Sequence, residues 1–404
     1  MDLFQSIDSS TSDARDGAIV IAGAPTGWGH MQAALNLGAW LQRKRPTCYV
    51  SVINACDYVS FSSRFISKTM WMMLSLHWPS FYSRLYSFLI RSPQVWHLSQ
   101  ERQAAVNDHC RRTFGQRKVL AFIATHPAAI HLGSYVKAQS ACKLFVVTTD
   151  FVFHNLWCAR GVDAYFADSG ASVVGSFASS VAAWAGAADL YRAGIPLAPE
   201  FDEQLEPRRA RLDLGLDPDR FTVLVSFGGE GLGFRQNIDL LRRLVRMNRA
   251  LQWVLIAGHD RELYDDLRKA FRNELGHKNL VHIRGFIGNM VQMMATADAL
   301  IGKAGGLTVS EALQMRLPIA IIHKLPGQEE YNARFVLRHG LGIETTDAEV
   351  LSGWLTHLHH RVCAEPRSYN SKRAPATSGG EIIADRVLDR IGLAAPAIVA
   401  SARA

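Results

Sequence analysis

The segment from Ala299 to Asn332 constrains the fold of this chain more than any other stretch of the sequence. Its letters, ALIGKAGGLTVSEALQMRLPIAIIHKLPGQEEYN, predict a strand (299–303), a glycine turn, a helix (308–316), a second strand (319–323) and a polar loop. Backbone N–H groups at a glycine-rich helix start can bind a phosphate. The polar loop after the next parallel strand lies at the same carboxyl edge of the sheet, where ligands of open α/β folds bind. A phosphate site beside groups that can hold hydroxyls indicates a nucleotide-sugar ligand.

Strand and helix patterns alternate on both sides of the segment GIPLAPEFDEQLEP, which holds three prolines and four acidic residues. Because 404 residues exceed what one core usually supports, this segment predicts a linker between two domains. The alternation predicts an α/β fold with two doubly wound parallel sheets and a ligand cleft between them. The expected division is residues 1–195, a linker at 196–207, residues 208–379, and a C-terminal helix and tail at 380–404.

The composition is that of a globular chain, with 48% hydrophobic and 20% charged residues. The net charge of +8 suits anionic lipid or small anionic ligands, and the lack of a Lys/Arg run longer than three argues against nucleic acid. Six scattered cysteines without CxxC spacing indicate reduced thiols in a cytosolic protein. The polar N-terminus and the lack of an apolar run of about 20 residues predict a soluble or peripheral protein.

Residues 57–98 differ from the rest of the chain, since aromatic residues and methionine alternate with arginine and lysine and no acid follows Asp57. Bulky apolar groups with only cationic charges suit the surface of an anionic membrane. The same pattern also fits amphipathic helices that pack on the sheet. We expect a lipid-facing surface here, and the two interpretations are compatible.

The first predicted strand, residues 18–23, runs into the turn APTGWGH, which carries Gly27, Trp28, Gly29 and His30. The imidazole at the start of the following helix, with an ordinary pKa near ~6.5, is suited to take a proton from an attacking hydroxyl. A histidine at a helix start is also often a hydrogen-bonded surface residue, so the sequence leaves both readings open.

A second polar loop follows the strand at residues 143–149 and carries Asp150, His154 and Trp157. A loop at a strand end is where acceptor-binding groups are expected. Each of the three residues could equally have a structural role.

Two charged residues near the glycine pair of the C-terminal half have alternative roles. Thr308 and Glu311 have the spacing of a capping box, in which the hydroxyl caps the helix and the carboxylate reaches back. Glu311 could instead accept hydrogen bonds from the ribose of a bound nucleotide. Lys303 could be a surface charge at a strand end or a partner for a phosphate.

Taken together, these stretches resemble the monogalactosyldiacylglycerol synthase and processive diacylglycerol glycosyltransferase group. This group lies in the inverting family that also holds the peptidoglycan lipid-intermediate N-acetylglucosaminyltransferase. The pieces that carry the resemblance are TGWGH, ACDYV with PSFYSRLY, ATHP, VTTDF, FGGEGLG, AGHDREL, RGFIGNM, GKAGGLTVSEAL and PGQEEYNA. The family turn is usually GGGH, whereas Trp28 here takes the place of the middle glycine.

The resemblance implies the GT-B architecture, with two Rossmann-like domains and a UDP-sugar bound mainly by the second. It implies that Phe286 and Ile287 meet the uracil and that Glu311 meets the ribose. The expected diphosphate contacts are Gly305, Gly306 and Thr308, beside Lys303, with the turn Gly228, Gly229 and Glu230 closing from the side. The sugar hydroxyls would be held by Gln328 and Glu329, next to Gly327. The acceptor side would be formed by Gly27, Trp28, Gly29, Asp150, His154 and Trp157, with His30 as the catalytic base.

The implied activity is an inverting, metal-independent hexosyltransferase, with UDP-glucose or UDP-galactose as substrate and no cofactor. The expected acceptor is diacylglycerol or a glycosyl-diacylglycerol at an anionic membrane surface, on the inner face of the cell membrane. Two alternatives remain: the same chemistry on a soluble natural product or another lipid, and a UDP-sugar 2-epimerase. The aromatic and basic segment argues against the epimerase, which needs no lipid surface.

Overall fold

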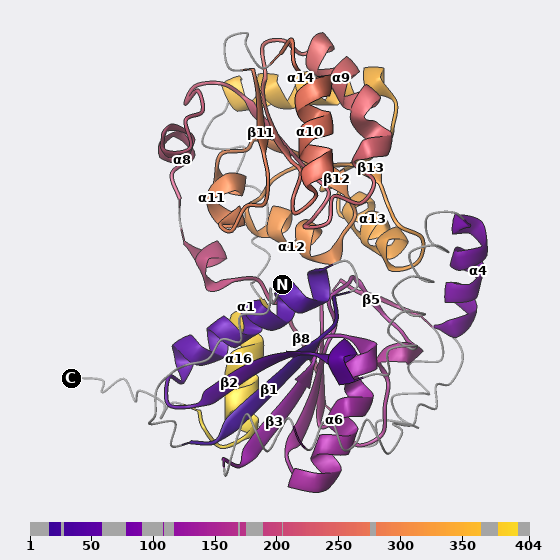
Figure 1. Cartoon of the computed structure of the whole chain (residues 1–404), viewed down its shortest axis with the longest axis vertical. Helices are drawn as coiled ribbons and strands as arrows, with labels where there is room; N and C mark the ends of the chain where they lie inside the picture. Colours follow the sequence, from indigo (N-terminus) through magenta and orange to yellow (C-terminus); the bar gives the residue numbers. More distant parts are fainter. Residues whose placement is uncertain are drawn as a thin grey trace, which may run out of the picture.

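The computed structural model describes residues 16–25, 28–58, 78–90, 108, 117–168, 170–174, 189–203, 205–274, 280–364 and 379–394. They form two lobes, each a parallel sheet covered by helices (Figure 1). The predicted α/β fold with two parallel sheets is confirmed.

The first sheet has the strand order β2-β1-β3-β4-β6-β8, and all its strands run parallel. Its strands are β1 (Ala18–Gly23), β2 (Tyr49–Asn54), β3 (Val119–Ala124), β4 (Lys143–Val147), β6 (Ala164–Ala167) and β8 (Asp189–Arg192). Its helices are α1 (Gly29–Lys44) and α6 (Pro127–Ser140), with α4 (Pro79–Leu89) at the side. The central strands are buried on both faces, which explains their continuous apolar runs.

The second sheet has the order β11-β10-β9-β12-β13-β14 and is also parallel throughout. Its strands are β9 (Thr222–Ser226), β10 (Gln252–Ile256), β11 (Val281–Arg284), β12 (Ala299–Lys303), β13 (Ile319–His323) and β14 (Gly342–Glu344). Its helices are α9 (Ile238–Met247), α10 (Arg261–Ala270), α11 (Met290–Ala295), α12 (Gly306–Gln314), α13 (Gln328–Arg338) and α14 (Ala348–Ala364). The strand order reverses between β9 and β12, and ligands of open α/β sheets bind at such a switch point.

The chain crosses between the lobes twice. The expected linker holds a short 3-10 helix, Pro199–Asp202, and leads into α8 (Pro207–Asp213). The predicted last helix is α16 (Gly379–Arg390), which returns to the first lobe and packs its buried side chains on α1 and the first sheet. The last helix therefore adds to the core of the first domain.

Helix α4 lies at the side of the first lobe, next to α13 of the second (Figure 1). Tyr82, Tyr86 and Ile90 form a small cluster with Tyr331 of α13. Most of the aromatic and basic segment, residues 59–77 and 91–98, lies outside the described residues. In the part of the chain that the structure describes, no helix has the length and apolar character needed to cross a membrane.

Candidate functional site

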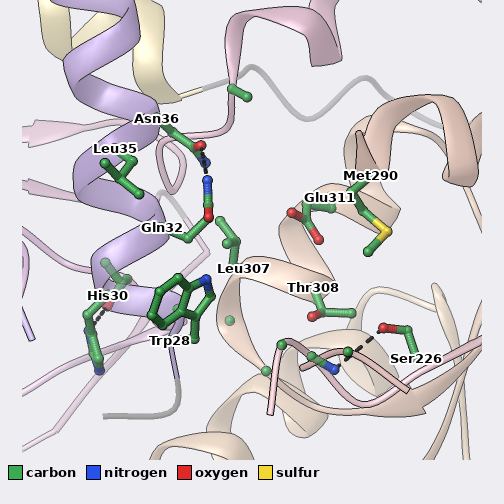
Figure 2. Close-up of a pocket in the computed structure, with 18 of the residues that line it drawn as sticks. Trp28, His30, Gln32, Leu35, Asn36, Ser226, Met290, Leu307, Thr308 and Glu311 are labelled. Atoms are coloured by element: carbon green, nitrogen blue, oxygen red, sulfur yellow. Dashed lines mark hydrogen bonds between the residues drawn. The ribbon is translucent and has the colours of Figure 1, made fainter. Parts of the chain in front are cut away.

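A cavity of ≈550 Å³ opens between the two domains, at the carboxyl ends of both sheets. The first domain contributes the start of α1 and the loop after β4 to its walls. The second domain contributes the turn after β9, the loop after β11, and the starts of α12 and α13. Figure 2 shows α1 on one side, with Trp28, His30 and Gln32, and Glu311 with Met290 on the other.

His30 lies in the first turn of α1, at the wall of this cavity. Its Nδ1 is 3.1 Å from the backbone oxygen of Thr125 and 2.5 Å from the hydroxyl oxygen of Thr149. A carbonyl oxygen can only accept, so Nδ1 carries the proton and Nε2 keeps a lone pair. Burial lowers the pKa of His30 to about 4, so the ring is neutral at pH 7. The turn thus presents a neutral imidazole whose Nε2 can accept a proton.

The glycine pair after β12 begins helix α12. Gly305 is the N-cap residue, Gly306 is the first helical residue, and no side chain caps this end. The predicted capping box is therefore wrong: Thr308 lies inside the first turn rather than at the cap. The residues of this uncapped turn line the cavity, where the positive helix end favours an anion.

Glu311 lies one turn further along α12 and points into the cavity (Figure 2). The residue is buried, with 9% of its surface exposed. Burial raises the pKa of its carboxyl group to about 8, so the group is mainly protonated at pH 7. A buried carboxyl group without an assigned structural role is a candidate partner for ligand hydroxyls.

The predicted polar loop after β13 is partly helical. Gln328 and Glu329 form the first turn of α13, and Gly327 is its N-cap with a φ of +95°. One carboxylate oxygen of Glu329 forms an ion pair with the buried Lys303, and the other accepts a hydrogen bond from the Leu325 N–H at 2.8 Å. Lys303 and Glu329 both line the cavity. The pair leaves the remaining lone pairs of the carboxylate available for ligand hydroxyls.

Asp150 joins the two domains at the base of the cavity. Its Oδ1 accepts a hydrogen bond from the Nδ2 of Asn332 on α13 at 2.8 Å. The same Nδ2 donates to the Ala304 oxygen at 2.9 Å, while the Asn332 Oδ1 accepts from the Phe151 N–H at 2.9 Å. Burial raises the pKa of Asp150 to about 7.

Most of the predicted site residues meet in this one cavity. Those that line it are Trp28, Gly29, His30, Asp150, Gly228, Gly229, Phe286, Ile287, Lys303, Gly305, Gly306, Thr308, Glu311, Gln328 and Glu329. Four others, Glu230, Gly327, His154 and Trp157, do not line its wall. Gly27 lies outside the described residues.

His154 and Trp157 pack behind the wall rather than in it. The Nε2 of His154 is 3.0 Å from the hydroxyl of Tyr86, and burial lowers the pKa of this histidine to about 3. Trp157 is 2% exposed in the core of the first domain, with its ring 6.4 Å from that of His30. Both residues support the site from behind.

Sequence reasoning missed three residues that hold site residues in place. Asn332 does so across the two domains, whereas Thr125 and Thr149 contact His30 within the first domain. Asn332, Thr125 and Thr149 are all buried, and each bonds a site residue. The signal for Asn332 is its place directly after PGQEEY, at the end of the segment from Ala299 to Asn332. Within the described residues, no group of three or more His, Cys, Asp or Glu side chains is arranged to hold a metal ion.

Two parallel α/β domains with facing carboxyl edges and one interdomain cavity define the GT-B class of proteins. MurG from Acinetobacter baumannii has the same fold, with a TM-score of 0.54 and 13% identity over 92% of this chain and 99% of that one. Residues 30–172 match the family model of monogalactosyldiacylglycerol (MGDG) synthase, and residues 232–387 match that of the glycosyltransferase family 28 C-terminal domain. Both matched domains are glycosyltransferase domains, and the resemblance expected from the sequence is confirmed.

Curated relatives agree with these family matches. A processive diacylglycerol beta-glucosyltransferase from Staphylococcus carnosus is 34% identical over 39% of this chain and 39% of its own length. The protein named "Probable monogalactosyldiacylglycerol synthase 2" from Oryza sativa subsp. japonica is 34% identical over 40% of this chain and 36% of its own. The chain thus spans about two fifths of the length of these two relatives.

Proposed function

We propose that this chain transfers a hexose from a UDP-sugar to the hydroxyl of diacylglycerol or a glycosyl-diacylglycerol. The proposal depends most on one observation: His30 of the first domain and the open helix start of the second line the same cavity. A proton acceptor and an anion site on opposite walls suit a displacement reaction with a phosphate leaving group.

The donor would lie against the second domain. The diphosphate fits the start of α12, and the half-exposed Phe286 offers an aromatic surface for the uracil. The carboxyl group of Glu311 would bind the ribose hydroxyls, and Gln328 with Glu329 would hold the sugar. The names of the relatives support glycosyl transfer to diacylglycerol, while the UDP-sugar, the inversion and the independence from metal are our own proposals.

The chemistry would proceed in one step. Nε2 of His30 takes the proton of the acceptor hydroxyl, whose oxygen attacks the anomeric carbon from the face opposite UDP. The bond between that carbon and the diphosphate oxygen breaks, and the configuration inverts. The backbone N–H groups of α12 stabilise the negative charge that builds on the leaving diphosphate. Removing one such donor typically costs about 3 kcal/mol of transition-state stabilisation.

The lipid acceptor would arrive from a membrane surface next to α4. Trp78, the N-cap residue of α4, is 59% exposed, and Phe81 in its first turn is 58% exposed. Arg84 follows one turn later and is also exposed. Exposed aromatic residues beside a cation, in a segment without acids, suit the interface of an anionic bilayer. The peripheral attachment is part of the proposal.

The direct test is transfer of hexose from UDP-glucose and UDP-galactose, with diacylglycerol in phosphatidylglycerol vesicles, with the lipid products analysed by mass. A hexosyl-diacylglycerol that forms only when a UDP-sugar and diacylglycerol are both present would support the proposal. UDP release with free hexose and no lipid product would show that water, and not diacylglycerol, accepts the sugar. Formation of an epimer of the sugar without any acceptor would indicate the 2-epimerase, and either result would overturn the lipid assignment.

A further inference from the structure

Trp28 adopts a backbone conformation that a tryptophan rarely takes. Its φ of +68° lies in the left-handed region, which glycine enters freely and residues with a Cβ do not. Within the described residues, only Ala141 and Arg316 share a positive φ without being glycine. A strained backbone persists where its surroundings hold it, often because the side chain serves the site.

The side chain of Trp28 reaches across the cleft to the second domain. Its Cδ1 lies 3.2 Å from the position that a Cβ on Gly229 would occupy, so the indole rests on the bare backbone of this turn. The ring also meets the imidazole of His259 edge-on, with centroids 5.7 Å apart and planes at 68°. Through these contacts the N-cap residue of α1 touches two loops of the other domain.

His259 carries the contact on to the expected uracil site. Its backbone N–H donates to the backbone oxygen of Gly229 at 2.9 Å, and its ring stacks on that of Phe286 with centroids 3.9 Å apart and planes at 18°. Trp28, His259 and Phe286 therefore form one continuous aromatic array from the first domain to the donor wall.

We propose that Trp28 is a positioning residue that clamps the first domain onto the donor-binding loops of the second through Gly229 and His259. The clamp holds Phe286 and the turn after β9 in the arrangement that binds a nucleoside diphosphate. This role of Trp28 rests on the proposed donor site, and it adds Trp28 to the residues that determine the affinity for the donor. Trp28 itself does not transfer a proton.

The test compares Trp28→Gly with Ala141→Gly, because both variants relieve a positive φ and only the first removes the clamp. Ala141 is the C-cap residue of α6 and does not line the cavity. We expect Trp28→Gly to weaken UDP binding about threefold to tenfold in calorimetry, the range typical of an aromatic pair. Its melting temperature should stay near that of the wild type, because strain relief offsets the lost packing. Ala141→Gly should bind UDP as the wild type does.

A double-mutant cycle that combines Trp28→Gly with His259→Ala tests whether Trp28 acts through His259. If the clamp acts through His259, the effects of the two changes on UDP affinity will not multiply. Fully multiplicative effects, or wild-type affinity in Trp28→Gly, would overturn the proposal.

Amide hydrogen exchange tests the role of Trp28 independently of the proposed function. Without any ligand, the amides of residues 228–233 and of His259 should exchange faster in Trp28→Gly and not in Ala141→Gly. Unchanged exchange would overturn the clamp. Lack of UDP binding by the wild type would overturn the donor assignment, and the exchange result would still decide the role of Trp28.

Discussion

At the scale of single residues, burial sets the protonation of the groups that line the cavity. His30 is held neutral with a pKa of about 4, and Glu311 is held protonated with a pKa of about 8. Each is the less charged form of its group, as expected where apolar walls disfavour charge. A neutral base and a neutral hydrogen-bonding acid suit a site that binds an anion and activates a hydroxyl.

His30→Ala should abolish most of the transfer and leave UDP binding intact. General base catalysis contributes about 10²- to 10⁴-fold, so we expect kcat/KM to fall by that factor while the Kd for UDP changes less than threefold. The control is His357→Ala, an exposed histidine on α14. Wild-type transfer by His30→Ala would remove this residue from the reaction.

The pH dependence of the wild type gives a second check on His30. Because the folded pKa lies below the ordinary 6.5, the neutral base persists as the pH falls and is lost only near pH 4. We therefore expect kcat/KM to remain high at pH 5.5. An acid limb centred at 6.5 would contradict this assignment.

The raised pKa of Glu311 predicts that the stability of the fold decreases as the pH rises. Its carboxyl group has a pKa of about 8 in the fold against 4.5 as its ordinary value, so the folded state keeps a proton that the unfolded chain releases. Stability should therefore fall as the pH rises from 4.5 through 8. Glu311→Gln removes this loss and should be more stable than the wild type at pH 8, by about 4 kcal/mol in urea unfolding. Equal pH profiles for the two proteins would show that burial does not protonate Glu311.

At the scale of the elements, α4 has one exposed aromatic side and one buried side next to the donor wall. Tyr86 on the buried side lies against Gly327, where a Cβ would come within 3.1 Å of the ring, and Ser83 donates to Glu330 at 3.3 Å. The exposed side carries Trp78 and Phe81. This helix therefore lies between the proposed membrane surface and the start of α13.

The double variant Trp78→Ser, Phe81→Ser should bind phosphatidylglycerol vesicles at least tenfold more weakly, since each large apolar side chain contributes about 1.5–3 kcal/mol when fully buried. Binding of the wild type should also weaken with salt, because the bilayer charge is screened. The control is Leu212→Ser, Val350→Ser, which changes exposed apolar residues on α8 and α14. Equal losses in both variants, measured by vesicle sedimentation, would contradict a membrane surface at α4.

The elements themselves were largely predictable from the sequence, and the errors have physical causes. Buried parallel strands such as β1 and β9 are short, continuous apolar runs rich in β-branched residues, and this composition and length identify them. The start of α12 was placed at Thr308 because its spacing to Glu311 imitates a cap. In the structure, Gly306 begins the helix and packs so closely on the Thr149 backbone oxygen that a Cβ would lie 2.2 Å from it. That contact comes from the other domain, so no local pattern reveals it.

At the scale of the whole molecule, the site depends on how the two domains meet. The glycine turns and His30 were found as separate motifs, while the bond between Asp150 and Asn332 joins residues 182 positions apart. Sequence periodicity reports on faces of single elements and carries no information on such pairs. The candidate site was thus predicted as two halves, and the structure supplies the residues that join them.

Asn332→Ala should loosen the domains as well as destabilise the chain. It removes three hydrogen bonds of a fully buried side chain and leaves Asp150 and the Phe151 N–H without this partner, which costs about 1–3 kcal/mol for each stranded group. The control is Asn248→Ala, a buried asparagine whose bonds to Leu244 and Ser352 stay within the second domain. We expect both variants to lose stability and only Asn332→Ala to bind UDP more weakly. Equal UDP affinity in both would contradict a role for Asn332 in closing the cleft.

The anomeric configuration of the lipid product tests the proposed reaction most directly. The experiment incubates the wild-type chain with an α-linked UDP-hexose and diacylglycerol vesicles. Proton NMR then gives the anomeric configuration of the glycolipid product. One displacement with His30 as base predicts a β-linked hexosyl lipid, formed by the wild type and lost in His30→Ala. An α-linked product would contradict the single displacement, and the same yield from His30→Ala would contradict the base.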